Sequence, residues 1–181
     1  MKGVVFVELI SMAEDLAGED AVDQVLEGCD LPSGGVFTTV GNYPCSELMT
    51  LVHAFSTSLD TPAGELQNRF GRWMFARFAQ GYPAFFKDKN DAFSMLESIE
   101  NEVHVEVRKL YPEAELPTFE TRRMGDGALE MIYSSERPLM DFCQGMIEAC
   151  TEHFGTPAAI ERREHRKDDK YVAGFEIRLA A

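Results

Sequence analysis

The sequence predicts an α+β protein, with a helical N-terminal subdomain packed on a C-terminal subdomain of helices and a four-stranded antiparallel sheet. Up to about residue 110, apolar residues recur every three or four positions, which is typical of helices. Beyond Pro112 the pattern changes to alternation, which is typical of strands. The 181 residues are enough for one domain with a substantial core. We expect the two parts of this single domain to be residues 1–88 and 89–181.

Four helices are predicted in the first part. They span residues 3–17, 20–27, 46–58 and 62–80. On the first, the expected buried face carries Val5, Leu9, Met12 and Leu16. On the fourth, the apolar residues at near i+4 spacing are Leu66, Phe70, Met74 and Phe78. Thr61 precedes Pro62, and this pair predicts a capping hydroxyl before a first-turn proline.

The longest predicted helix runs from about residue 90 to residue 110. Its expected buried stripe contains Phe93, Leu96, Ile99, Val103, Val107 and Leu110. At about 100° per residue, His104 falls on the flank of this stripe. Spacing alone therefore favours a histidine at the surface or at the boundary of the core.

The remaining elements are four strands and one helix. The strands are expected at 119–124, 128–134, 158–165 and 171–179, and the helix at 139–154. Gly125-Asp126-Gly127 predicts the first hairpin, and Lys167-Asp168-Asp169 predicts the turn of the second. The last strand alternates apolar side chains, so one face of the sheet should be buried.

Composition limits the possible partners and the cellular compartment. A formal charge of −14 argues against nucleic acid and anionic membranes, which bind basic surfaces. Thirteen Phe and nine Met suit either an ordinary core or the lining of an apolar cavity. The four cysteines form no CxxC pair, and acidic residues interrupt the apolar N-terminus. We therefore expect reduced thiols in a cytoplasmic protein.

Tyr133, Ser135 and Arg137 alternate along the chain. In an extended strand these side chains would share one face, with no acidic residue between them on that face. Two hydroxyls and a guanidinium together suit an anion with several oxygens, such as a pair of carboxylates. The same pattern also occurs on ordinary surface strands, so by itself it does not decide between the two interpretations.

Taken together, these motifs resemble those of one family. The N-terminal Met-Lys-Gly, the segment Glu-Val-His-x-x-Val-x-Lys-Leu-Tyr-Pro at 102–112, Pro117 and the Tyr-x-Ser-x-Arg motif follow one another in the family's order. The chain closely resembles, over nearly its whole length, the heme nitric oxide/oxygen-binding domain family. These are bacterial gas sensors related to the heme domain of soluble guanylate cyclase. The resemblance implies a heme b (iron protoporphyrin IX) held between the two parts.

The resemblance also implies individual roles. His104 would be the proximal iron ligand, and Tyr133, Ser135 and Arg137 would bind the heme propionates. Pro117 would press on the porphyrin and bend it. A neutral imidazole is a good iron ligand, and one protein ligand leaves the sixth coordination position open for a gas. His53, His153 and His165 are expected to be structural or exposed.

The distal residues bear on the choice of gas. Family members that bind oxygen place a tyrosine five residues after the arginine of the propionate motif, and here that position is Phe142. The family's other polar distal positions correspond to Leu9 and Met74, with Val5 and Phe78 nearby. Bound O2 needs a hydrogen-bond donor, whereas NO and CO do not. We therefore expect a ferrous heme that binds NO and CO and excludes O2.

The resemblance implies a sensor and not an enzyme. NO would break the bond between His104 and iron, and the signal would pass in trans to a histidine kinase or to an enzyme that makes or degrades cyclic-di-GMP. Some members hold zinc through cysteines, but this chain has none after Cys150, so we expect no zinc and buried thiols at Cys143 and Cys150. The alternatives are an O2-binding heme sensor and a heme-free adaptor that binds other proteins.

Overall fold

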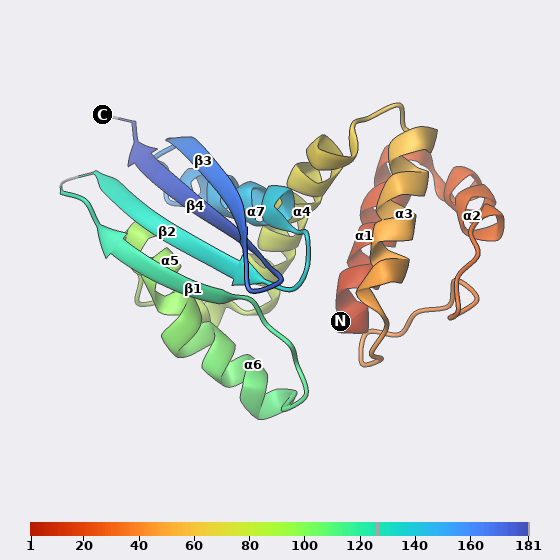
Figure 1. Cartoon of the computed structure of the whole chain (residues 1–181), viewed down its shortest axis with the longest axis horizontal. Coiled ribbons are helices and arrows are strands. Elements are labelled where there is room, and N and C mark those ends of the chain that lie inside the picture. The colour runs from red at the N-terminus through yellow and green to blue at the C-terminus, as the bar shows by residue number, and fades with distance from the viewer. Residues whose placement is uncertain (126, 181) are drawn as a thin grey trace.

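The computed structural model describes residues 1–125 and 127–180, and it confirms the α+β fold class (Figure 1). Long helix α4 leads from a group of helices to the part that contains the sheet. The elements are α1 (Gly3–Ala17), α2 (Glu19–Gly28), α3 (Cys45–Ser58), α4 (Ala63–Gly81), a 3₁₀ turn (Pro83–Phe85), α5 (Ala92–Ser98), a π-helical turn (Ile99–Val103), α6 (His104–Leu110), β1 (Thr118–Arg123), β2 (Ala128–Ser135), α7 (Met140–His153), β3 (Ala158–Lys167) and β4 (Lys170–Leu179).

Helix α1 is where predicted, but its buried face is rotated from the predicted one. The buried residues are Gly3, Phe6, Leu9, Met12 and Ala13. Val5 is only half-buried, and Leu16 is 48% exposed. The reason is tertiary: two rings from the loop before α3, those of Phe37 and Tyr43, pack on Phe6 with centroid distances of 4.6 and 5.3 Å, and this packing favours burial of that side of α1.

Helix α4 contributes to both hydrophobic cores. Phe70 and Met74 belong to the cluster of α1 to α3, whereas Phe75 belongs to the cluster beneath the sheet. The expected cap at Thr61 is wrong, because its hydroxyl donates to the carbonyl of Leu59 at 3.1 Å. The helix starts at Ala63 without a side-chain cap.

Helices α4 and α7 cross at very short range. An added Cβ at Gly71 would lie 2.0 Å from the carbonyl oxygen of Phe142, and one at Gly145 would lie 2.0 Å from that of Asn68. Only glycine allows two backbones to approach so closely. This crossing joins the helical part to the sheet part.

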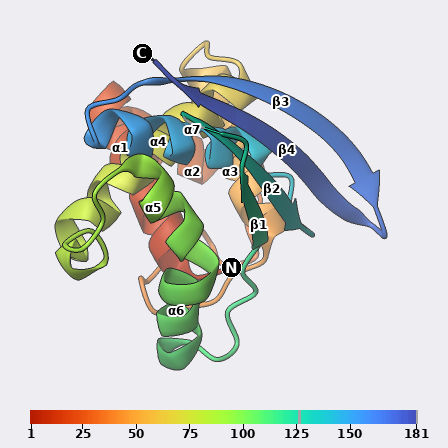
Figure 2. The same ribbon diagram turned by 90° about the vertical axis from the view of Figure 1, so that its left-hand side faces the viewer.

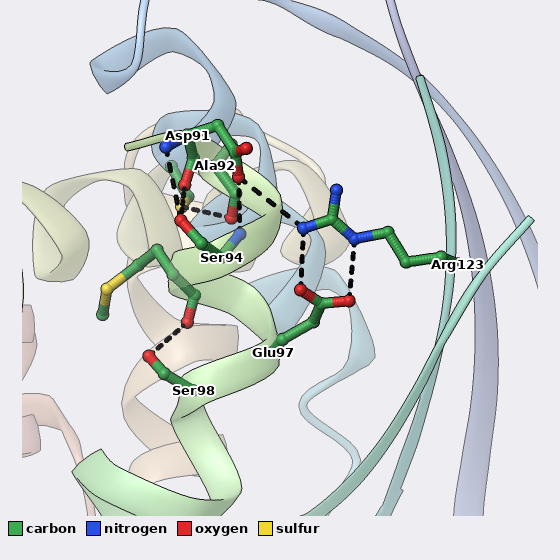
Figure 3. A network of polar contacts seen from close by, with 8 residues as sticks. Asp91, Ala92, Ser94, Glu97, Ser98 and Arg123 are labelled. Atoms are coloured by element: carbon green, nitrogen blue, oxygen red, sulfur yellow. Dashed lines mark hydrogen bonds and ion pairs between the residues drawn. The ribbon is translucent and has the colours of Figure 1, made fainter. Parts of the chain in front are cut away.

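The helix predicted over residues 90–110 is interrupted. Asp91 caps α5 by accepting from the amide of Ser94 at 2.6 Å, and a bidentate pair between Arg123 and Glu97 ties α5 to β1 at 2.9 and 2.8 Å (Figure 3). The π-helical turn Ile99–Val103 then separates α5 from α6. A π turn holds one residue more than an α turn, so residues after it are rotated relative to the predicted stripe.

The sheet is fully antiparallel, in the order β1-β2-β4-β3. Helices α5 and α7 pack on one of its faces (Figure 2). Ala173, Phe175 and Ile177 of β4 are fully buried, which confirms the predicted alternation. The β3–β4 turn is made by Asp168 and Asp169, with φ of 49° and 62°, as in a two-residue hairpin.

The first hairpin joins β1 and β2 as predicted, although Asp126 lies outside the described residues. Gly125 and Gly127 on either side have φ of 103° and 77°, values that favour glycine. Over residues 1–125 and 127–180, no helix combines the length and the apolar character that crossing a membrane requires.

Candidate functional site

His104 is buried, with 8% of its surface exposed. It is the first residue of α6 and directly follows the π-helical turn. The expectation from a regular helix, a histidine on the flank, is wrong. The extra residue of the π turn changes the phase of the helix, so that His104 faces inward while Leu110, predicted to be buried, is 68% exposed.

The carboxylate of Glu100 binds the imidazole. The distance from His104 Nδ1 to Glu100 Oε2 is 3.1 Å. The same carboxylate accepts from the guanidinium of Arg108 at 2.8 Å and from the amide of Phe119 at 3.2 Å. Burial alone would raise the pKa of Glu100, but these hydrogen bonds outweigh it and the pKa is lowered. Glu100 is therefore ionised at neutral pH.

Burial lowers the pKa of His104, although the hydrogen bond to Glu100 works in the opposite direction. A neutral imidazole carries one proton, and a carboxylate can only accept, so we assign that proton to Nδ1. The free lone pair is then on Nε2, and no hydrogen bond to Nε2 is found within residues 1–125 and 127–180. Nε2 is thus the nitrogen available to a metal.

Aromatic rings connect His104 to the propionate motif. The ring of Phe119 lies 5.6 Å from that of His104 and 5.8 Å from that of Tyr133, between centroids. Phe119 is also the register partner of Tyr133 across β1 and β2. The structure therefore brings the predicted ligand and the predicted propionate motif to the same end of the sheet.

Tyr133 and Ser135 share the buried face of β2, but Arg137 lies beyond the strand, which ends at Ser135. The expectation of three side chains on one strand face is therefore wrong for Arg137. The chain turns back there: the phenol of Tyr133 donates to the carbonyl of Arg137 at 3.1 Å, and the amide of Arg137 donates to Ser135 Oγ at 3.1 Å. This turn keeps all three side chains together.

The guanidinium of Arg137 already binds a carboxylate, that of Glu115, at 2.5 Å. It also donates to the backbone carbonyl of Glu115. Burial raises the pKa of Tyr133, so its phenol remains a donor at any physiological pH. Pro117 is half-buried in the segment that connects α6 to β1, two residues before Phe119.

The predicted distal residues gather in the helical cluster. Leu9 and Met74 are buried within it, at 0% and 1% exposure, and Val5, Phe78 and Phe142 pack against it. The ring of Phe142 lies 5.1 Å from that of Phe70. The indole N–H of Trp73, which precedes Met74 on α4, donates to Glu8 at 2.9 Å. These five side chains themselves carry no hydrogen-bond donor.

The donor set fits a heme. One buried neutral imidazole with a free Nε2 is the chemistry of an axial iron ligand. Arg137, which here binds a carboxylate, could equally bind a propionate, with Tyr133 and Ser135 beside it. An apolar cluster rich in Phe, Leu and Met suits the porphyrin face.

The four cysteines lie in two different environments. Cys143 and Cys150 are buried in the core beneath the sheet, whereas Cys29 and Cys45 are half-buried. Across residues 1–125 and 127–180, there is no cluster of three or more His, Cys, Asp or Glu side chains placed to hold a metal ion.

Sequence reasoning assigned no role to Glu100, Phe119 or Glu115. The signal for Glu100 was present, because a carboxylate four residues before a histidine lies on the same side of a helix. The contacts of Phe119 and Glu115 join segments that are far apart in sequence, and no local pattern predicts them.

The chain matches the model of the haem-NO-binding family over residues 2–162. Among solved structures, the unliganded Fe(II) H-NOX protein from K. algicida is 35% identical, with a TM-score of 0.92 over 100% of this chain and 97% of that chain. A mutant of the T. tengcongensis H-NOX is 24% identical, with a TM-score of 0.89 and coverage of 100% and 98%.

An oxygen-binding H-NOX domain related to soluble guanylate cyclases, solved as its oxygen complex, is 24% identical, with a TM-score of 0.84 and coverage of 100% and 96%. Comparison with curated protein sequences gave no significant match. The two likenesses at 24% identity support the fold alone. The family match and the 35% identical protein go further: this chain belongs to the haem-NO-binding, or H-NOX, family of heme-binding gas-sensor domains.

Proposed function

We propose that this protein is a nitric oxide sensor. Its ferrous heme b would bind NO and CO, exclude O2, and regulate a separate signalling enzyme in trans. His104 is proposed as the iron ligand, and Tyr133, Ser135 and Arg137 as the propionate site. The observation that carries the proposal is the pairing of one buried imidazole, free at Nε2, with a distal cluster of five side chains that carry no hydrogen-bond donor: Val5, Leu9, Met74, Phe78 and Phe142.

We assign the selectivity for NO and CO over O2 to the apolar distal side chains. When bound, the heme iron supplies one open coordination position for a diatomic gas. Leu9, Met74 and Phe142 can exclude water from that position, but they cannot donate the hydrogen bond that stabilises bound O2. The indole N–H of Trp73 is occupied by Glu8. The same apolar side chains are compatible with NO and CO, which need no hydrogen-bond donor.

Signalling is assigned to the release of His104 from the iron. His104 begins α6, so its release would free that helix at its first residue. At the other end of α6, the ring of Tyr111 lies 4.4 Å from the ammonium of Lys2, which directly precedes α1. A movement of α6 can therefore reach the helical part. We propose that residues 1–88 and 89–181 then rotate relative to each other, with relief of the strain that Pro117 imposes on the porphyrin.

A histidine kinase or a cyclic-di-GMP synthase or phosphodiesterase is the proposed partner. The formal charge of −14 favours a basic docking surface on that enzyme. The proposal assigns no catalysis to the chain itself.

The visible absorption spectrum tests the proposal. The anaerobically reduced protein should give a single Soret band of five-coordinate ferrous heme, which brief exposure to air leaves unchanged and NO shifts. Phe142→Tyr should create a stable oxygen complex, because it adds one phenol donor to the distal cluster. Phe142→Leu, which stays apolar, is the matched control and should remain unchanged in air.

Two results would contradict the proposal in different ways. A stable oxygen complex of the unmodified protein would show that the distal cluster does not exclude O2. A correctly folded protein that is colourless after growth with ample heme would reject the heme itself and would favour a heme-free adaptor.

A further inference from the structure

We propose that Glu100 is a positioning residue whose carboxylate sets how firmly His104 is held on the heme iron and how readily it is released. This inference rests on the proposed function of His104 and deepens it.

The carboxylate of Glu100 is a junction between three segments. It lies in the π-helical turn, and Oε2 contacts Nδ1 of His104 at 3.1 Å. Oε2 also accepts from the amide of Phe119 in β1 at 3.2 Å, and Oε1 accepts from Arg108 in α6 at 2.8 Å. Two of these three contacts do not involve the histidine, so the carboxylate stays in place whether or not His104 is bound to iron.

A carboxylate on Nδ1 changes the imidazole as a ligand. It fixes the tautomer with the lone pair on Nε2, it fixes the plane of the ring, and it makes the imidazole more basic. A more basic imidazole binds iron more strongly and leaves it less readily. A neutral hydrogen-bond partner in the same place would do each of these things more weakly, since hydrogen bonds to charged groups are about twice as strong.

The contact with Phe119 links this effect to the sheet. Phe119 packs between His104 and Tyr133, and its amide is held by the same oxygen that binds the imidazole. If His104 were released from iron, movement of its ring would have to break its contact with Glu100 or carry the π-helical turn away from β1. We therefore infer that Glu100 couples the position of the ring to the attachment of the helix to the sheet.

The test compares Glu100→Gln with Glu106→Gln in the reduced, heme-loaded protein. Glutamine keeps the shape of the side chain and removes the charge. Glu106, two residues after His104, bonds to Lys109 and lies on the exposed side of α6, so its variant removes the same charge close to His104 without touching the imidazole. The first readout is the iron–histidine stretching frequency by resonance Raman spectroscopy. The second is the rate of heme transfer to excess apomyoglobin.

Glu100→Gln should lower the stretching frequency and accelerate heme loss by up to about 10–100-fold, the usual range for mutation of such a supporting partner. Glu106→Gln should resemble the unmodified protein in both readouts. If Glu100→Gln binds heme and matches Glu106→Gln in both readouts, the role of Glu100 is wrong and the sensor proposal stands. If none of the three proteins binds heme, the proposed function itself fails.

A measurement on the unmodified protein covers the case in which Glu100→Gln does not fold. In its diamagnetic CO complex, the Nδ1 proton of His104 should give a downfield NMR resonance that exchanges slowly with water, because Glu100 accepts it in a buried position. A rapidly exchanging Nδ1 proton would overturn the inference.

Discussion

At the scale of single residues, burial controls the chemistry of the two core cysteines. It raises the pKa of Cys143 and of Cys150 to about 12, from an ordinary value of 9.0. Both thiols lie in the apolar core beneath the sheet. They therefore stay protonated, and poorly nucleophilic, as long as the chain is folded.

This shift predicts how stability depends on pH. Above about pH 9 the unfolded chain loses thiol protons that the native protein retains, so the free energy of unfolding falls as the pH rises toward 12. Below pH 9 the contribution is fully present. Each thiol contributes a slope of up to about 1.4 kcal/mol per pH unit in this window.

Urea unfolding of the protein and of the Cys143→Ala, Cys150→Ala double variant, between about pH 8 and pH 11, measures this slope. The variant should be less stable at every pH, because two buried side chains are truncated, but its stability should fall less steeply above pH 9. Lysine and tyrosine titration affects both proteins equally and cancels in the comparison. Equal slopes would contradict the assignment.

At the scale of elements, the sequence predicts a helix or strand well when residues within that segment determine it, and poorly when contacts from distant segments do. Helix α7 and strands β1 to β4 follow from spacing and turn residues within the segment, and Asp168-Asp169 even determines the turn type. The π-helical turn before His104 has no pattern of its own. The buried face of α1 differs from the predicted one because Phe37 and Tyr43, from a distant loop, pack on Phe6. Motif resemblance, in contrast, named His104 despite its unfavourable predicted position.

The crossing of α4 and α7 gives a prediction at this scale. Gly145→Ala would place a methyl group 2.0 Å from the carbonyl oxygen of Asn68, so the helices must separate. The expected cost is about 1–3 kcal/mol of unfolding free energy, as for other overpacked contacts. The readout is the midpoint of thermal unfolding.

Gly81→Ala is the matched control. An added Cβ at Gly81, the last residue of α4, meets no atom within 4 Å. That substitution should be neutral or slightly stabilising, since alanine favours helix more than glycine does. A Gly145→Ala protein as stable as the Gly81→Ala protein would mean that the two helices are not held as closely as described.

At the scale of the whole molecule, the two hydrophobic clusters meet along α4, and the N-terminus lies close to residues of the sheet-containing part. Met74 and Phe75 are adjacent in sequence but belong to different clusters. Burial lowers the pKa of the Met1 amino group, and the positive charge of Arg137 adds to this effect, so the N-terminus lies near the proposed propionate site. A rotation of one part against the other would therefore change the surroundings of Arg137 and of the contact between Lys2 and Tyr111.

Distances between nitroxide labels test this rotation. Labels introduced through unnatural amino acids at the exposed residues Asp23 of α2 and Arg163 of β3 span the two parts, and labels at Asp23 and Ser58 lie within one part. The distance between the labels at Asp23 and Arg163 should change when NO is added to the reduced protein. The distance between the labels at Asp23 and Ser58 should stay constant. His104→Gly should show the changed distance without NO, because its α6 is never held by iron. If the distance between Asp23 and Arg163 does not change in a sample whose spectrum proves that NO has bound, the rotation is excluded.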